Sequence, residues 1–238
     1  MSLPNTRTLT EEVLVVLSLS LLASAAYAII DVLSAPVRGV YRASFPQVQL
    51  ATQLADVVFD LAPVWLVFHL LRRSGEGVAA IGLGRGRLGS DLGRGFVLFA
   101  VVGLAGVGVY LGSVELGVNR YVVPVPPLGH WWTIPILVLG SLQAALLEEV
   151  VAVGYLVTRL RQLRWTALAA VGASALLRGG YHLYQGWGAF AGNAVLGALF
   201  GVVFLRTRRL WPIVIAHMLL DVAAGVGFIL FRERLPGF

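Results

Sequence analysis

The chain has 238 residues, of which 58% are hydrophobic and 13% are charged, and it contains no cysteine. Its charged fraction is about half that of an average soluble domain, which excludes an ordinary soluble protein. The lack of cysteine excludes disulfides, thiolate catalysis and cysteine-based metal sites. All 18 positive residues are arginines that lie in clusters between apolar runs, a pattern that indicates membrane topology and not nucleic-acid binding.

Apolar runs long enough to cross a bilayer recur along the whole chain. They lie at about 13–34, 53–71, 95–117, 133–156, 166–183, 189–205 and 211–232. The first run is too long for the core of a signal peptide, so we expect it to be a retained span. The pattern predicts an all-α fold, a polytopic transmembrane helix bundle with seven to eight spans, in which residues 1–238 form a single integral membrane domain.

The arginines are distributed unevenly between the two sides of these seven runs. Five lie on one side, at positions 38, 42, 120, 232 and 234, and twelve lie on the other, at positions 7, 72, 73, 85, 87, 94, 159, 161, 164, 206, 208 and 209. The positive-inside rule therefore predicts an integral cell-membrane protein with a cytoplasmic N-terminus. The remaining arginine, Arg178, falls within the fifth expected span.

Two glycine-rich features have structural explanations. The stretch Gly82–Gly86 lacks the Lys-Ser/Thr ending and the flanking strand of a phosphate-binding loop, so we expect a cytoplasmic turn. In the sixth expected span, Gly197 and Gly201 form a G-x-x-x-G pair, which predicts the close approach of another helix.

Ionisable side chains gather in three of the later apolar runs. Glu148 and Glu149 are adjacent within the fourth expected span, His182 lies in the fifth, and His217 and Asp221 lie in the seventh. Burying such groups in lipid costs roughly 3 kcal/mol each on insertion scales, so they are seldom kept without a function. His217 and Asp221 are four residues apart and share a helix face, as do Arg178 and His182. Together these residues indicate an active site.

Each of these groups also has an ordinary structural explanation. A lone histidine such as His182 is often a hydrogen-bonded packing residue, and Glu148 and Glu149 would be solvated if they lay at a span end. The occurrence of all three groups on three of the last four expected spans favours a shared site.

The order and spacing of these residues resemble the CPBP family of intramembrane proteases, which includes type II CAAX prenyl endopeptidases and bacteriocin-processing or immunity proteins. The family pattern is E-E-x-x-x-R, then F-x-x-x-H, then H-x-x-x-N or H-x-x-x-D, each on its own transmembrane helix. The matching segments are 148–153, 178–182 and 217–221, and the resemblance covers a catalytic core of about residues 133–225. Val153 stands in place of the family arginine, and Arg178 stands in place of the family phenylalanine.

The resemblance implies an intramembrane endopeptidase that hydrolyses peptide bonds of membrane-associated proteins or peptides with a glutamate-activated water. By the same resemblance, Glu148 with His182 would activate the water, and His217 with Asp221 would face the oxyanion. Glu149 would orient its neighbours, and we expect Arg178 to hold the glutamates in place of the arginine that is lacking at position 153. The expected partners are membrane lipid and the substrate, for which peptide leaders, small membrane proteins and prenylated CAAX proteins are all candidates.

A metal-free, glutamate-type mechanism without a cofactor is the preferred expectation, because the chain has no H-E-x-x-H or other tight metal-binding spacing. In a metal-dependent mechanism, Glu148, His182 and His217 would be the zinc ligands.

Two other classes of function remain alternatives. One is a catalytically silent membrane scaffold or bacteriocin-immunity-type protein, which Val153 favours. The other is a small transporter or proton relay, although the chain lacks the internal inverted repeat typical of transporters.

The site hypothesis makes geometric predictions. Glu148, His182 and His217 should converge around one water-accessible cavity that opens to the cytoplasmic half of the membrane. For His182 to reach it, either Gly179 and Gly180 break the fifth helix or the expected span limits are inaccurate.

Overall fold

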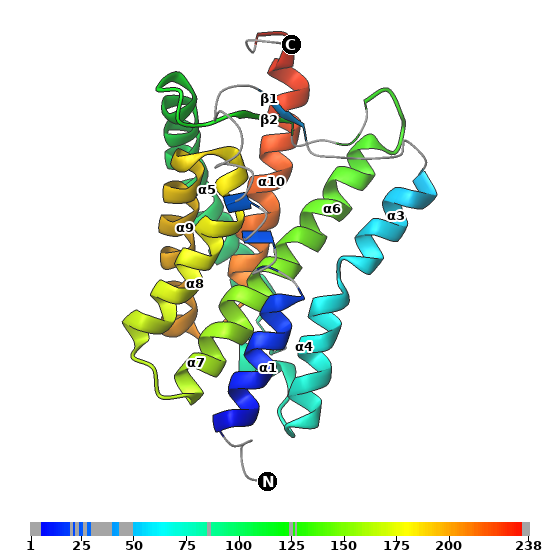
Figure 1. Cartoon of the computed structure of the whole chain (residues 1–238). Coiled ribbons are helices and arrows are strands. Elements are labelled where there is room, and N and C mark those ends of the chain that lie inside the picture. The colour runs from blue at the N-terminus through cyan, green and yellow to red at the C-terminus, as the bar shows by residue number, and fades with distance from the viewer. Residues whose placement is uncertain are drawn as a thin grey trace.

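The computed structural model describes residues 6–19, 21, 24, 25, 28, 29, 40–42, 50–84, 87–123, 126 and 128–234, which form a helix bundle (Figure 1). The α-helices are α1 (Thr6–Ser18), α3 (Leu50–Phe59), α4 (Ala62–Arg73), α5 (Leu88–Glu115), α6 (Thr133–Glu148), α7 (Thr158–Gln162), α8 (Ala167–Tyr181), α9 (Trp187–Thr207) and α10 (Trp211–Phe231). Short 3₁₀ helices are η1 (Val78–Ile81), η3 (Leu183–Gln185) and η4 (Arg232–Arg234), and η2 (Glu149–Val157) is π-helical. Two three-residue strands, β1 (Val40–Arg42) and β2 (Tyr121–Val123), pair in parallel. The expected all-helical bundle is confirmed.

Among the described residues, five helices are long and apolar enough to cross a membrane. They are Gln53–Arg73, Leu88–Glu115, Thr133–Gln162, Trp187–Thr207 and Trp211–Phe231. This is fewer than the seven to eight expected spans. The first expected span, 13–34, lies partly outside the described residues, and the fifth corresponds to α8, which has 15 residues.

The helix α4 continues the direction of α3, and α7 continues that of α6, whereas the connected segments α3–α4, α5, α6–α7, α8, α9 and α10 run in alternating directions through the bundle (Figure 1). The C-terminal end of α4 and the short helix α7 lie at the lower end in this view, whereas β2 and the C-terminal end of α10 lie at the upper end. Arg72, Arg73, Arg159 and Arg161 belong to the last turns of α4 and α7. The connections that are rich in arginine therefore gather at one end of the bundle.

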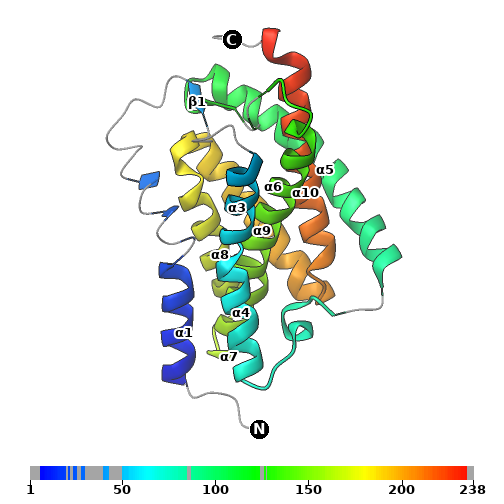
Figure 2. The same cartoon turned by 90° about the vertical axis from the view of Figure 1, so that its right-hand side faces the viewer.

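The centre of the bundle is the continuous helix formed by α6, η2 and α7. The helices α3, α4, α8, α9 and α10 contact it from several sides, and Figure 2 shows it between α3 and α4 on one side and α9 and α10 on the other. Every residue of η2 is buried. By contrast, α5 packs on α10 and α9 at the periphery and exposes most of its apolar surface, as a lipid-facing helix does.

The change from α-helical to π-helical geometry occurs at Glu149, next to Glu148. Interruptions of this kind are rare and occur frequently at functional sites. The neighbouring helix α8 stabilises this segment, because the Ser174 hydroxyl donates a hydrogen bond to the Ala152 carbonyl at 2.8 Å. The change in helix type alters the directions in which the residues after Glu148 project.

Helix α8 begins after an N-cap residue, Thr166, whose hydroxyl accepts a hydrogen bond from the Ala169 amide at 3.1 Å. It continues through Gly179 and Gly180 to Tyr181, so of the two alternatives for His182 these glycines do not break the helix, and the expected span limits are inaccurate. A Cβ at Gly179 would lie 2.8 Å from the Phe190 carbonyl oxygen, and this glycine instead lets α8 and α9 pack closely.

The length of α8 explains how His182, which follows it, can be deep in the bundle. Fifteen residues span about 22 Å, which is less than the hydrocarbon core of about 30 Å. The expected G-x-x-x-G contact is also present, because positions equivalent to a Cβ on Gly197 and Gly201 would lie 3.1 Å from Ala175 and 3.0 Å from Val171 of α8.

At the arginine-rich end, the turn after η1 is tied to the turn between α9 and α10. Gly82 has φ of 85°, and its carbonyl accepts a hydrogen bond from the Leu210 amide at 2.9 Å. A Cβ at Gly82 would approach the Leu210 nitrogen to 2.8 Å, so both the backbone conformation and the close approach require glycine. Arg209 adds an ion pair with Asp91 of α5 and a 2.8 Å hydrogen bond to the Gly84 carbonyl.

Candidate functional site

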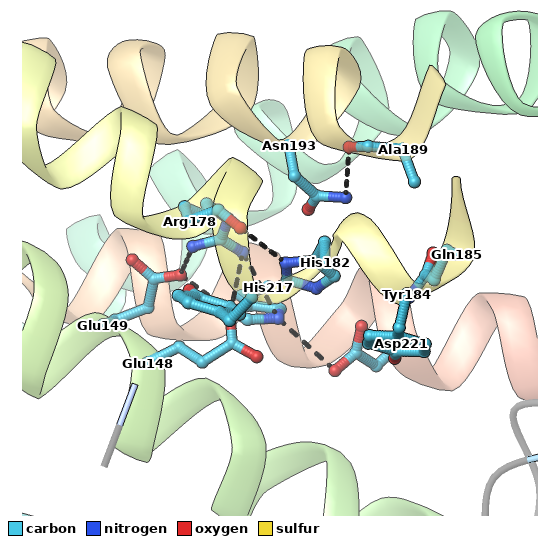
Figure 3. A network of polar contacts seen from close by, with 11 residues as sticks. Glu148, Glu149, Arg178, His182, Tyr184, Gln185, Ala189, Asn193, His217 and Asp221 are labelled. Carbon is cyan, nitrogen blue, oxygen red and sulfur yellow. Dashed lines mark hydrogen bonds and ion pairs between the residues drawn. The ribbon is translucent and has the colours of Figure 1, made fainter. Parts of the chain in front are cut away.

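The ionisable residues singled out in the sequence meet at the middle of the bundle (Figure 3). Glu148 and Glu149 lie at the junction of α6 and η2, Arg178 lies in the last turn of α8, and His182 directly follows α8. The pair from α10, His217 and Asp221, faces them from the opposite side.

Glu149 is the most enclosed member of the group. Its Oε1 accepts a hydrogen bond from Arg178 Nη1 at 2.5 Å and one from His217 Nδ1 at 2.7 Å. The side chains of Glu149, Arg178 and His217 are 0%, 2% and 5% exposed. A carboxylate held by two donors in so dry a setting is fixed in position and shielded from water, which suits an orienting role.

Glu148 has a different environment although it is adjacent in sequence. Its Oε2 accepts a 2.7 Å hydrogen bond from the Tyr181 hydroxyl and lies 3.5 Å from Arg178 Nη2. Its side chain is 15% exposed and lines a cavity. The two neighbouring carboxylates are thus divided between a buried ion pair and an accessible cavity wall.

His182 is oriented by the helix that it follows. Its Nδ1 donates to the Arg178 carbonyl at 3.0 Å, because a carbonyl oxygen can only accept. In the neutral ring this leaves the lone pair on Nε2, and the residue lines the same cavity as Glu148. His182 therefore offers a base to the cavity and keeps its other nitrogen occupied.

His217 and Asp221 contribute one face of α10 to the cavity. His217 Nε2 lies 3.4 Å from Asp221 Oδ2, while Nδ1 of the same ring is directed to Glu149. The Asp221 side chain is 40% exposed. The histidine therefore joins the buried Glu149 to the accessible Asp221.

One cavity of about 350 Å³ is lined by Glu148, His182, His217 and Asp221 together. Its other lining residues come from α3 and the turn after it, from β2 and the connection to α6, from α6 itself, from η3 and from α10. They include Gln53, Asp56, Asp60, Val122, Pro126, Ser141 and Gln185. These segments lie away from α7 and the end of α4, toward the end of the bundle that holds β2 (Figure 1). The cavity is thus directed away from the arginine-rich half of the bundle, so the expectation that it opens toward that half is wrong.

The reason lies in the direction of the central helix. The cavity follows the N-terminal half of α6, where Ile136, Gly140 and Ala144 lie on its wall, and ends at Glu148. Beyond Glu148 the helix is packed on all sides, since every residue of η2 is buried. The short distance along the central helix between Glu148 and the arginine-rich end therefore does not determine the side on which the cavity lies.

The loop that carries His182 and η3 is held by residues before β2. The Asn119 side-chain oxygen accepts from the Ala189 amide at 2.8 Å, and Arg120 donates to the Tyr184 carbonyl at 3.0 Å. The Arg120 amide also donates to the Gln185 carbonyl at 2.8 Å. These contacts fix the position of η3 against the bundle.

Sequence reasoning missed three residues at the site. Tyr181, the hydrogen-bond donor to Glu148, lies within a segment that resembles the family, but it carries no charge that would single it out. Asp56 and Asp60 line the cavity from α3 and its following turn. The sequence could have pointed to both aspartates, because two carboxylates four residues apart within an apolar run are as unusual as the glutamate pair.

Val153, which stands in place of the family arginine, is 1% exposed and belongs to the apolar core. Arg178 supplies a guanidinium to both glutamates instead, at 2.5 Å from Glu149 and 3.5 Å from Glu148. Its side chain points into the bundle and is 2% exposed, so it does not extend to the membrane interface.

The group that would hold zinc in the metal-dependent alternative, Glu148, His182 and His217, lies beside a buried guanidinium. The Glu148 oxygen Oε2 is bound by Tyr181 and lies near Arg178, whose positive charge faces the same group. Among the described residues, no group of three or more His, Cys, Asp or Glu side chains has a metal-binding arrangement. A guanidinium already supplies the positive charge near these carboxylates.

Comparison with known proteins gives one match. Residues 130–223 match the family model of type II CAAX prenyl endopeptidase Rce1-like proteins, which confirms the expected CPBP-type family resemblance for this part of the chain. The match contains Glu148, Arg178, His182, His217 and Asp221. No curated protein and no solved structure matches the chain.

Proposed function

From the Rce1-like domain at residues 130–223 and the geometry around Glu148, we propose that the protein is an intramembrane endopeptidase that uses a glutamate-activated water. The observation that carries the proposal is that the two adjacent glutamates have different surroundings. Glu149 is buried against Arg178 and His217, whereas Glu148 faces a cavity that His182, His217 and Asp221 also line.

In the proposed reaction, Glu148 is the general base. A water in the cavity gives a proton to Glu148 while its oxygen attacks the carbonyl carbon of the scissile peptide bond, which forms a tetrahedral oxyanion. The Tyr181 hydroxyl holds Oε2, so Oε1 is the oxygen that accepts the proton. His182, with Nε2 as an acceptor, helps to position the water.

Collapse of the tetrahedral intermediate breaks the carbon–nitrogen bond. The proton held by Glu148 passes to the leaving nitrogen, so that the products are a carboxylic acid and an amine and the glutamate is regenerated. His217 can stabilise the oxyanion through Nε2 when that nitrogen carries a proton, because Nδ1 already donates to Glu149. Asp221 lies 3.4 Å from Nε2 and orients the ring.

The proposed enzyme lies in the cell membrane with its N-terminus in the cytoplasm, because the arginine-rich connections gather at one end of the bundle. Its partners are membrane lipid and a membrane-associated protein or peptide. A catalytically silent scaffold or immunity-type protein is the alternative that Val153 favours, although Arg178 supplies the positive charge that Val153 cannot.

The test is cleavage of a library of membrane-anchored fluorogenic peptides by the full chain in liposomes. Glu148→Gln keeps the shape and the acceptor for Tyr181 but removes the base, so we expect the rate to fall by about 100-fold or more with unchanged thermal unfolding. Glu115→Gln, an exposed glutamate at the end of α5, is the control and should retain full activity. Adding EDTA should not change the rate. Cleavage that survives in Glu148→Gln would contradict the proposed mechanism, and a lack of any cleavage would favour the silent scaffold.

A further inference from the structure

Two carboxylates on the cavity wall take no part in the proposed reaction. Asp56 and Asp60 are one helical turn apart, and the Asp60 amide donates to the Asp56 carbonyl at 2.9 Å, so both side chains are on one side of α3 and its following turn. Both lie within the candidate span Gln53–Arg73. Ionisable groups at such positions are costly in lipid and usually mark a substrate path or a binding site.

Positive charge that would balance these carboxylates is lacking within the described part of the chain. No ion pair joins Asp56 or Asp60 to an arginine there, and no arginine is among the cavity-lining residues. The guanidinium of Arg178, which belongs to the site, is 2% exposed and bound to Glu149. The sequence contains no lysine at all.

Carboxylates therefore outnumber the cationic groups at the cavity. Four carboxylates line it, on Asp56, Asp60, Glu148 and Asp221, together with the two histidines. Clefts lined by charge of one sign with apolar walls concentrate the electric field and raise the local concentration of ions of opposite charge. Its volume of about 350 Å³ is within the range of ligand-binding pockets, so part of a peptide can enter it.

We propose that Asp56 and Asp60 form a specificity subsite that binds a positively charged side chain of the substrate close to the scissile bond. The inference rests on the proposed endopeptidase function and names its substrate class: a membrane-associated peptide with lysine or arginine near the cleaved bond. The same field disfavours a substrate whose free C-terminal carboxylate must enter the cavity. Asp56 and Asp60 touch the substrate and select it, while Glu148 carries out the chemistry.

The test uses one membrane-anchored peptide with Lys, Gln or Glu at each of three positions on either side of the cleaved bond. All peptides have an acetylated amino terminus, and a matched set has a free one. We expect kcat/KM for the best Lys peptide to exceed that of its Glu counterpart by about tenfold or more, which corresponds to about 1.4 kcal/mol. In Asp56→Asn combined with Asp60→Asn the ratio should approach one, and in Asp56→Lys combined with Asp60→Lys it should reverse.

Glu115→Gln is the matched control, because it removes an exposed carboxylate outside the cavity and should leave the ratio unchanged. Binding of the same peptides to Glu148→Gln, measured by fluorescence anisotropy, reports the preference without turnover. The two proposals can thus fail separately. Glu148-dependent cleavage and binding without a charge preference would overturn the acidic subsite alone, whereas Lys-selective binding without cleavage would leave the subsite and overturn the protease. A preference that disappears on acetylation would assign the contact to a terminal amine and overturn the side-chain subsite.

Discussion

Arg178 Nη1 lies 2.5 Å from Glu149 Oε1, although 29 residues separate them in the sequence and both side chains are almost completely buried. This ion pair joins the short helix α8 to the central helix at the point where its geometry changes. The arginine and His217 together occupy Glu149, so of the two adjacent glutamates it is Glu148 that faces the cavity.

Removing the guanidinium alone should destabilise the fold strongly. Arg178→Met leaves the carboxylate of Glu149 buried without its cation, and we expect a loss of about 3–5 kcal/mol in the free energy of unfolding. In the double variant Arg178→Met with Glu149→Gln the buried charge is gone, so the loss should be clearly smaller than the sum of the two single losses. Unfolding of the purified protein in mixed micelles measures all three. Arg206→Met at the exposed end of α9 is the control, and simple additivity would argue against the pair.

A second prediction concerns Val153, the position at which the family has arginine. In the unaltered protein, Val153→Arg places a second guanidinium in a core position that is 1% exposed, and it should lower both folded yield and activity. In Arg178→Phe the same change should instead restore part of the lost activity, since it returns a cation near Glu149. The decisive result is that Val153→Arg lowers activity in the unaltered protein but raises it in Arg178→Phe. Equal harm in both, or full activity of Arg178→Phe alone, would show that Arg178 does not replace the family arginine.

The third prediction tests the hydrogen bond from Tyr181 to Glu148. Tyr181→Phe removes a donor 2.7 Å from Oε2, and because hydrogen bonds to charged groups contribute about 1.5–3 kcal/mol, kcat should fall by roughly tenfold or more. KM and thermal unfolding should change little. Tyr155→Phe removes a hydroxyl that is buried elsewhere on the central helix and should leave kcat unchanged. An equal effect of both substitutions on kcat would indicate a general packing defect.

Several parts of the site follow from the sequence because they depend on simple spacing. His217 and Asp221 are four residues apart in one helix, so their shared face could be predicted without a structure. Arg178 was the one arginine inside an expected span, and the cost of burying it alone led to the expectation that it meets the glutamates.

Other parts of the site depend on how helices are rotated and packed against one another, and the spacing of residues in the sequence does not specify this. Which glutamate faces the cavity is set by how the central helix is turned, and the π-helical segment that starts at Glu149 alters that rotation in a way that no residue pattern announces. The side on which the cavity lies depends on where α3 and η3 leave space beside α6. The depth of His182 depends on α8 being only 15 residues long.

The last prediction concerns the arginine-rich end of the bundle, far from the cavity wall. Asp91 is 0% exposed and accepts two hydrogen bonds from Arg209, one of them from Nε at 3.2 Å, while Nη1 of the same guanidinium bonds the Gly84 carbonyl. The hydrogen bond and charge of Asp91 raise the pKa of Arg209, so the cation persists at any pH at which the protein is folded. Arg209→Gln leaves Asp91 buried without a cation, and unfolding should become easier by about 3 kcal/mol.

Arg209→Lys should recover only part of this loss, because an ammonium cannot make the forked contact with both carboxylate oxygens and also reach Gly84. Neither Arg209 nor Asp91 lines the cavity, so the activity of each variant per folded molecule should equal that of the unaltered protein. Arg206→Gln, which changes an exposed arginine at the end of α9, is the stability control. If Arg209→Gln and Arg206→Gln unfold alike, the ion pair does not stabilise the turn between α9 and α10. If the activity per folded molecule falls together with stability, the arginine-rich end is energetically coupled to the cavity. The fully buried η2 segment lies between them and would then have to transmit this coupling through its packing.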